Sequence, residues 1–383
     1  MTAHEEVFIS LVRNSLWDTP VEVPDGFKSW GLVMRMSKVQ AMQGSVAKGL
    51  LDSPDILATM RPDAYVRLSD MVMMNAGMHS KADCSLQVLV LELRKAGIKP
   101  VLLKGQGLAA NYRYPEVRQC GDVDLYVGVE NYRKSYEVLK MVVDEIDEPS
   151  CLDGDGKHYH AQLAGTMIEV HRYSEVSSIP SVGRIYQRYA SEGLSQNLVE
   201  VAFKDLSVLT PADNFNAFYI FSHLWNHFLS AGVGLRQICD WAVFLHARGS
   251  NVDRDYLRKI LTELKLMTPW QTFGCIAVDI LGLPVEDFPF YDAKYRSKAR
   301  RVLDRILLEG NFGQETDFVR NPTRGFLYEK LFSLKCHLQR FFGLVSLFPY
   351  HAWAQVRSAV GDGFRRLVAE VFYNLNFREL NKR

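Results

Sequence analysis

The segment GDVDLYVG, residues 121–128, carries two aspartates one residue apart. Apolar and polar residues alternate in it, which predicts a strand, and side chains two residues apart in a strand point to the same side. Asp122 and Asp124 therefore share one face, which we expect to be exposed, while the apolar residues beside them face the core. Two carboxylates at this separation repel each other unless a cation lies between them. Carboxylate oxygens suit Mg²⁺ or Mn²⁺, which complete their shells with water and substrate phosphates, so the pair predicts a metal and a phosphate.

A third carboxylate, Glu169, lies in a second alternating run, TMIEVHRY, at residues 166–173. Glu169 and His171 share one face of this predicted strand, and Ile168 and Val170 share the other. Two-metal sites hold their ions about 3.5–4 Å apart, where they activate an attacking oxygen and stabilise a leaving oxygen. We expect Glu169 to complete a metal-binding and catalytic group with the two aspartates and to orient or deprotonate the attacking hydroxyl. His171 is expected to be a partly buried, hydrogen-bonded side chain beside the acids rather than a general base.

Lys104 and Gly105 lie where a predicted strand ends and a predicted helix begins. Backbone N–H groups and the helix dipole favour an anion at such a point. Gly105 lets the backbone approach a ligand closely and Lys104 adds a point charge, so this step is predicted to bind a nucleotide triphosphate. Arg118 either binds a phosphate or fixes the loop by pairing with a carboxylate. The GxxxxGK[ST] spacing of a P-loop is absent, and Gly105-Gln106-Gly107 is no dinucleotide fingerprint.

The surrounding pattern predicts the elements that position these residues. The first hundred residues read as mostly helical, and the last long helix among them ends at Gly97. The period then changes and predicts a strand at 99–105, a helix at 106–114, the aspartate strand and a helix at 129–146. Two alternating runs flank Ala164-Gly165, which predicts a tight hairpin turn. A small mixed sheet is therefore expected over roughly 98–175, followed by a short β signal at 198–209.

The region after residue 209 reads as helical. Thr210 can cap a helix whose first residue is Pro211, and Asp213 favours the same end through the helix dipole. Amphipathic segments continue toward the C-terminus, the last of them at residues 364–380. The predicted fold class is therefore α+β, with a small mixed β-sheet core, an N-terminal helical segment and a C-terminal helical bundle. The predicted domains cover residues 1–82, 83–209 and 210–383.

Composition bounds the function. The chain has 383 residues, a net charge of +1, 48% hydrophobic and 23% charged residues, which suits a globular protein with a sizeable core and argues against specific nucleic-acid binding. Six scattered cysteines without a CxxC pair indicate reduced thiols in a cytoplasm rather than zinc ligands. The N-terminus lacks a signal-peptide pattern, and no apolar run reaches the ~18–20 residues of a transmembrane segment. The nearest run, 341–356, is interrupted by Pro349 and His351, which favours buried helices and a turn over docking to a membrane surface.

Four further side chains are predicted on two consecutive helices, in pairs four residues apart: His223 with His227, and Arg236 with Asp240. The segment HLWNH lacks the glutamate of HExxH, so zinc binding by the histidines is not favoured. We expect them to pack between helices or to line a cleft, and Arg236 to form an ion pair with Asp240 that faces the active site. Together with His171, the residues His223, Arg236 and Asp240 form the predicted acceptor cleft.

In this order, these motifs resemble the nucleotidyltransferase superfamily of the DNA polymerase β type, and most of all its bacterial branch of uncharacterised nucleotidyltransferases. The resemblance rests on the LLKG step, on Arg118 followed by GDVDLYV, and on IEVHR. It continues through LTPADNF, HLWNH and LRQICDWAVFL and covers roughly residues 85–285. It implies a mixed-sheet catalytic core at 83–209 with a helical partner domain. It also implies transfer of a nucleoside monophosphate from an NTP to an acceptor, with release of pyrophosphate.

The resemblance assigns roles to individual residues. Asp122 and Asp124 match the metal-binding pair, and Glu169 takes the place of the third acid. The chain departs from the superfamily in two ways, because Lys104-Gly105 replaces the usual Gly-Ser phosphate step and the third acid is Glu rather than Asp.

The sequence thus predicts a cytoplasmic nucleotidyltransferase that uses Mg²⁺ or Mn²⁺ and an NTP. Its acceptor would be a hydroxyl-bearing small molecule or protein, and no transmembrane segment is expected. Two alternatives stay open. One is a catalytically inactive protein of the same fold that binds or regulates a partner, as an antitoxin does; the other is an enzyme that nucleotidylates a protein or peptide.

Overall fold

The computed structural model describes residues 1–148, 156–177, 179–311 and 326–357. The chain divides into two compact units, one of residues 1–176 and 186–316 and the other of residues 177–185 and 317–383. All residues of the candidate site belong to the first unit. The domain limits after residues 82 and 209 stay predictions, and the helix expected at 364–380 lies outside the described residues.

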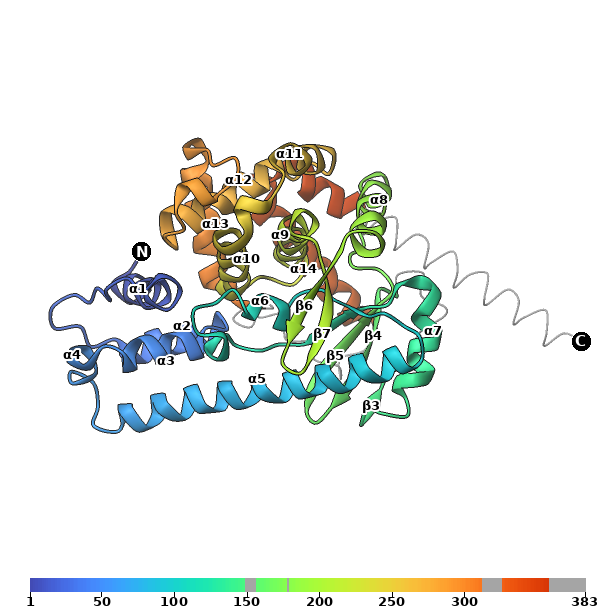
Figure 1. Ribbon diagram of the computed structural model, residues 1–383. Coiled ribbons are helices and arrows are strands. Elements are labelled where there is room, and N and C mark those ends of the chain that lie inside the picture. The colour runs from blue at the N-terminus through green and yellow to red at the C-terminus, as the bar shows by residue number, and fades with distance from the viewer. Residues whose placement is uncertain (149–155, 178, 312–325, 358–383) are drawn as a thin grey trace, which may run out of the picture. The chain divides into compact units, whose positions relative to one another are not determined.

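A seven-stranded mixed sheet lies in the first unit (Figure 1). Its strand order is β3-β4-β5-β2-β1-β7-β6. The strands are β1 (Val101–Leu102), β2 (Val123–Tyr126), β3 (Glu145–Ile146), β4 (His158–Leu163), β5 (Thr166–His171), β6 (Leu198–Phe203) and β7 (Leu206–Pro211). β2 pairs in parallel with β5 and antiparallel with β1, and β1 pairs in parallel with β7. The mixed sheet and the α+β class predicted from the sequence are confirmed, although β6 and β7 extend the sheet beyond the expected limit at residue 175.

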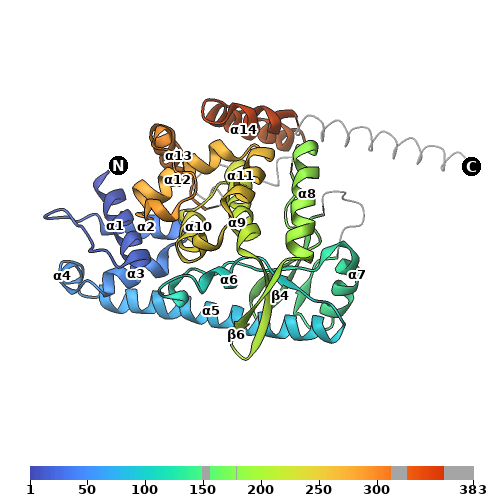
Figure 2. The same ribbon diagram turned by 45° about the horizontal axis from the view of Figure 1, so that its top comes forward.

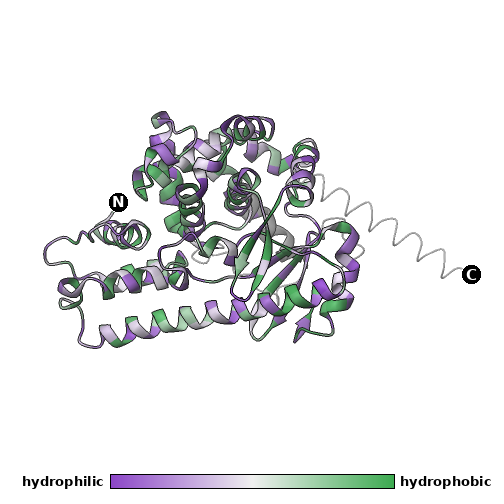
Figure 3. Cartoon of the chain, viewed as in Figure 1, coloured by the Kyte–Doolittle hydropathy of each residue, from purple (hydrophilic) through white to green (hydrophobic). Residues whose placement is uncertain are grey.

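The region before the sheet is helical, as predicted. Its helices are α1 (Ala3–Trp17), α2 (Trp30–Val39), α3 (Gln43–Leu51), α4 (Pro54–Leu57) and α5 (Ala64–Lys95). Gly97, with a φ of 76°, follows the end of α5 where a helix stop was expected. Figure 3 shows hydrophilic and hydrophobic residues alternating along α5, as expected for a helix with one buried side.

One face of the sheet packs against α5 and α7 (Gly128–Leu139), and α5 runs past the strands in both ribbon views (Figures 1 and 2). The core between them contains Leu86, Leu89, Leu93, Tyr136, Val123, Leu125, Ile168 and Val170. The apolar residues of β2 and β5 therefore face this core, as the alternation predicts. The polar residues of the same strands face the opposite side, so the candidate site lies on the side of the sheet away from α5.

The hairpin between β4 and β5 turns at Ala164 and Gly165, which confirms the predicted turn. Their φ angles are 50° and 79°, and two-residue hairpin turns favour positive φ at both central positions. The turn fixes the register of the two strands, in which His158 lies opposite His171 and His160 lies opposite Glu169.

The helix expected at 106–114 is only one turn long, α6 (Gln106–Ala109), and the 3-10 turn η1 (Pro115–Val117) follows it. A residue before proline avoids helical backbone, and Tyr114 accordingly has a φ of −124° and a ψ of 84°. The short α6 has little dipole to offer an anion, so the predicted contribution of a helix start at Gly105 is weak.

The helix expected to begin at Pro211 begins instead at Asp213, as α9 (Asp213–Ser230). Thr210 and Pro211 belong to β7, because they pair with Val199 and Leu198 of β6. Hydrogen bonding across this hairpin outweighs the local preference of a Thr-Pro step for a helix start.

Helices follow the sheet, as predicted. In the first unit they are α9, α10 (Leu235–Arg248), α11 (Arg254–Glu263), α12 (Met267–Cys275), the π-helical η3 (Ile276–Ile280) and α13 (Arg296–Glu309). α8 (Pro180–Ser195) precedes β6, and α14 (Phe326–Val345) belongs to the second unit. The apolar run 341–356 contains the end of α14, a turn and further helix from residue 349. None of the helices in the described parts of the chain combines the length and the apolar character that a membrane crossing requires.

Candidate active site

Three carboxylates meet on the open side of the sheet. Asp124 in β2 and Glu169 in β5 are direct partners in the parallel register, and Asp122 lies immediately before β2. One carboxylate oxygen of each lies within 4.8 Å of the others, a spacing at which the three groups could hold a metal ion. The structure therefore brings together the three acids that the sequence singles out.

Asp124 is the most enclosed of the three, with a side chain that is 0% exposed. Its Oδ1 accepts hydrogen bonds from Lys104 Nζ and from His171 Nε2, each at 2.9 Å. The expectation that both aspartates are exposed is wrong for Asp124, because these two side chains cover its carboxylate. Burial raises the pKa of Asp124, but the Lys104 ammonium and the His171 hydrogen bond outweigh burial and lower that pKa to about 2.

His171 joins two of the acids, since its Nε2 also lies 3.3 Å from Glu169 Oε2. Burial lowers the pKa of His171, but its hydrogen bonds to Asp124 and Glu169 outweigh burial and raise that pKa above its ordinary value. Burial raises the pKa of Glu169, and the His171 hydrogen bond with the Lys104 charge holds it below its ordinary range. Both carboxylates are therefore ionised at neutral pH, and His171 is a buried, hydrogen-bonded group beside them.

A divalent cation fits this acid centre. The second carboxylate oxygen of Asp124, Oδ2, is buried and has no hydrogen-bond partner among the described residues. Buried acceptors are normally paired, so this oxygen is available to a ligand. Together with the carboxylates of Asp122 and Glu169 it provides the all-oxygen donor set that Mg²⁺ and Mn²⁺ prefer.

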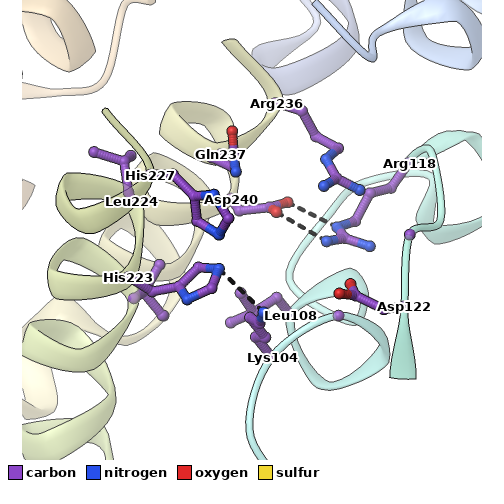
Figure 4. A pocket seen from close by; sticks show the side chains of 13 residues that line it. Lys104, Leu108, Arg118, Asp122, His223, Leu224, His227, Arg236, Gln237 and Asp240 are labelled. Carbon is purple, nitrogen blue, oxygen red and sulfur yellow. Dashed lines mark hydrogen bonds and ion pairs between the residues drawn. The ribbon is translucent and has the colours of Figure 1, made fainter. Parts of the chain in front are cut away.

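The Lys104 ammonium lies between the acids and α9 (Figure 4). Its Nζ is 3.0 Å from His223 Nε2 as well as 2.9 Å from Asp124 Oδ1. An ammonium can only donate, so His223 Nε2 accepts, and His223 Nδ1 donates to Glu175 Oε1 at 2.6 Å. Burial and the Lys104 charge lower the pKa of His223, which keeps its imidazole neutral.

Glu175, which accepts the hydrogen bond from His223, was not predicted from the sequence. It is 5% exposed, and its carboxylate accepts from Lys157 Nζ and from Asn226 Nδ2, each at 3.0 Å. Burial raises the pKa of Glu175, but Lys157 and His223 outweigh burial and hold the pKa well below its ordinary value. Glu175 lies beyond the end of β5, where neither strand nor helix periodicity marks a position, so the sequence contains no signal for it.

Gly105 connects Lys104 to α6 with a φ of 62° and a ψ of −111°. Side chains other than glycine avoid this conformation, and a Cβ at this position would lie 3.1 Å from the carbonyl oxygen of Asp122. The glycine thus lets the segment after β1 pass close to the aspartate strand.

Arg118 forms a two-point ion pair with Asp240 of α10. Nε and Nη2 of Arg118 donate to the two carboxylate oxygens at 2.7 and 2.8 Å, and Tyr112 Oη donates to the same carboxylate at 2.6 Å. The expected pair between Arg236 and Asp240 is wrong, because Asp240 is taken by Arg118 and Arg236 Nη1 donates to the carbonyl oxygen of Gln119 at 2.8 Å. Burial raises the pKa of Asp240, but the Arg118 guanidinium outweighs burial and lowers it.

A pocket opens beside the acids, between the segment that follows β1 and helices α9 and α10 (Figure 4). Its charged lining consists of Lys104, Arg118, Arg236, Asp122 and Asp240. Nη1 of Arg118 and Nε of Arg236 are buried and have no hydrogen-bond partner within the described part of the chain. Guanidinium groups with unused N–H donors suit an anionic ligand, so this pocket favours phosphate or carboxylate groups.

His223 and His227 also line the pocket, as expected for cleft-lining residues, and their ring centroids lie 4.4 Å apart. Neither belongs to a potential metal-binding group within the described residues. The structure therefore places Lys104, Gly105, Arg118, His223, Arg236 and Asp240 around one pocket, while His171 lies behind Asp124 and outside the lining.

Residues 28–282 match a protein family described as uncharacterised nucleotidyltransferase. The chain belongs to this family. In this nucleotidyltransferase-family protein the matched region contains the acid centre, the whole sheet and both sides of the pocket. A solved structure, that of an antigenic nucleotidyltransferase-like protein from Paracoccidioides brasiliensis, is similar at 13% identity and a TM-score of 0.33, over 56% of this chain and 96% of that one. None of the curated proteins matches the chain.

Proposed function

We propose that the protein is a cytoplasmic nucleotidyltransferase of the DNA polymerase β type, from the bacterial branch of the superfamily. It would move a nucleoside monophosphate from an NTP to a hydroxyl group of an acceptor and release pyrophosphate. The observation that carries the proposal is the meeting of Asp122, Asp124 and Glu169 on one face of the sheet, next to a pocket that Arg118 and Arg236 line. Membership of the nucleotidyltransferase family supports the same reaction class.

The three acids would hold Mg²⁺ or Mn²⁺, which when bound stabilises the charge that develops on the transferred phosphoryl group. Glu169 is ionised, so its carboxylate can accept a hydrogen bond or a proton from the attacking hydroxyl. Lys104, Gly105 and Arg118 would bind the triphosphate. Of these, Arg118 lines the pocket and has a buried nitrogen, Nη1, without a partner among the described residues, while Lys104 also neutralises Asp124.

The acceptor would lie on the helical side of the pocket, where His223 and Arg236 reach it. Asp240 contributes indirectly, because its carboxylate is fully engaged by Arg118 and Tyr112 and holds the guanidinium in place. His171 is fully buried and holds the two carboxylates instead of contacting the acceptor.

The test is transfer from α-labelled ATP, GTP, CTP and UTP with Mg²⁺ or Mn²⁺, to a panel of hydroxyl-bearing small molecules and to protein. Asp124→Asn is expected to lower transfer by at least about 10³-fold, roughly 4 kcal/mol of transition-state stabilisation. Asp52→Asn, on the exposed end of α3, is the matched control and should transfer normally. Unchanged transfer in Asp124→Asn, or a wild type without nucleotide-dependent metal binding, would overturn the proposal.

One contact favours a second candidate, a binding or regulatory protein that keeps the fold without catalysis. The Lys104 ammonium already supplies a positive charge to Asp124 Oδ1, as a metal ion would. Titration with a fluorescent NTP analogue and capture of partner proteins distinguish the two functions. Firm partner capture without NTP binding would favour the second candidate, and labelled protein in the transfer assay would identify a protein-nucleotidylating enzyme.

A further inference from the structure

Histidines extend the polar face of the sheet one strand beyond the acids. His158 and His160 of β4 lie opposite His171 and Glu169 of β5, and Glu169 in turn lies opposite Asp124 of β2. Because residues two apart in a strand share a face, all five side chains project from the same side of the sheet. The proposed transfer reaction gives no role to His158 or His160.

The ring nitrogens of these histidines surround the Glu169 carboxylate. Nε2 of His158 and Nε2 of His160 lie 3.8 and 3.7 Å from Glu169 Oε1, and Nε2 of His171 lies 3.3 Å from Oε2. One ligand atom each from His158, Glu169 and His171 lie within 4.8 Å of one another. Ligand atoms bound at about 2.0–2.2 Å to one ion lie up to about 4.3 Å apart, so small side-chain rotations are enough to close the group around a metal.

The histidines on this face of the sheet also have buried ring nitrogens. Nδ1 of His158 and Nδ1 of the fully buried His171 have no hydrogen-bond partner within the described residues. Two histidines that crowd a carboxylate and leave buried ring nitrogens unpaired are poorly explained as packing alone.

We propose that His158, Glu169 and His171 form a transition-metal site next to the acid centre, with His160 at hand as a further ligand. Two imidazoles and one carboxylate favour borderline ions such as Zn²⁺, Co²⁺ or Ni²⁺ over Mg²⁺, whereas the all-oxygen acid group has the opposite preference. Glu169 belongs to both groups, so an ion on the histidine side would fix the carboxylate that the acid centre also uses. The site does not require the protein to transfer nucleotides.

The test is Co²⁺ binding by the full chain without a histidine tag or nucleotide, and with millimolar Mg²⁺ present to saturate the acid centre. We expect a visible absorption band from imidazole-bound Co²⁺ that Mg²⁺ does not remove. His158→Ala should weaken Co²⁺ binding by about tenfold or more. His4→Ala, near the N-terminus, is the matched control and should bind like the wild type. Equal Co²⁺ affinity in His158→Ala and His4→Ala would overturn the site.

A second measurement on the wild type does not depend on a folded variant. In ¹H–¹⁵N spectra of the imidazole rings, Zn²⁺ should shift the ring nitrogens of His158 and His171, and Mg²⁺ should not. Shifts confined to other histidines would overturn the proposal. A protein that binds Co²⁺ through these rings but transfers no nucleotide would keep this inference and refute the proposed function, whereas transfer without imidazole ligation would do the reverse.

Discussion

The acid centre and the arginine side of the neighbouring pocket are built in different ways. In the acid centre, strand register places Asp124 beside Glu169, and the alternation of each strand directs both side chains to the same face of the sheet. On the arginine side, Arg118 lies on a loop and Asp240 on a helix, 122 residues apart in the sequence. Only side-chain contacts bring these two residues together. The difference shows that side chains placed by strand pairing can be predicted from the sequence. Ion pairs between separate elements can be identified only when the fold is known.

The comparison would be tested most severely at Asp240. Asp240→Ala leaves the Arg118 guanidinium buried without its counter-ion, and removing one partner of a buried pair typically costs about 3–5 kcal/mol of unfolding free energy. Chemical denaturation measures this loss. Asp52→Ala, which removes an exposed partner of Lys48, should cost at most about 1 kcal/mol. A loss at Asp240 no greater than at Asp52 would show that the arginine side is not held by this pair.

The segment that links the acid centre and the arginine side depends on one glycine. Gly105→Ala forces a side chain into a backbone conformation with a φ of 62° and toward the Asp122 carbonyl, so we expect a loss of about 1–3 kcal/mol in unfolding free energy. Gly77→Ala is the matched control, because Gly77 is exposed within α5 with open space around it. There, alanine should stabilise the protein by about 0.5–1 kcal/mol. Equal changes in unfolding free energy for Gly105→Ala and Gly77→Ala would show that the backbone conformation of Gly105 does not matter for the segment after β1.

The smallest expected effect is a dependence on pH at the arginine side. The pKa of Asp240 is lowered in the folded protein from its ordinary value of 3.8, so its contribution to stability is complete above that value and is lost as the pH falls through the folded pKa. The stability difference between the wild type and Asp240→Asn should therefore narrow by less than about 1 kcal/mol between pH 7 and pH 3.5. A difference that widens on acidification would mean that Asp240 is not the ionised partner of Arg118.

Much of the sheet could be predicted, because the alternation of apolar and polar residues shows which side chains of a strand face the core and which face the other side. Val123 and Leu125 enter the core, the turn at Ala164 and Gly165 closes the hairpin, and Glu169 reaches the aspartates. These features depend on neighbours in sequence or on a single strand pairing. The α+β class follows from them together with the helical periodicity before and after the sheet.

Other features depend on tertiary contacts that leave no local pattern. Thr210 and Pro211 look like a helix start, yet pairing with β6 keeps them in a strand. A spacing of four residues puts Arg236 and Asp240 on one helix face, yet the facing Arg118 offers a better two-point geometry. The predicted exposure of Asp124 was wrong for a similar reason. Asp124 occupies a polar position in the alternating pattern, and it is buried only because Lys104 and His171 cover it.

The place of β7 in the sheet also means that the acids are synthesised before the segments that complete their surroundings. The three acids lie within residues 122–169, but β1, which leads to Lys104, pairs on its other side with β7, at Leu209. His223, the second contact of the Lys104 ammonium, follows later in α9. At about 5–20 residues per second, a ribosome needs several seconds to pass from the last acid to this histidine. The carboxylates of a nascent chain are thus made before the helix that completes their pocket.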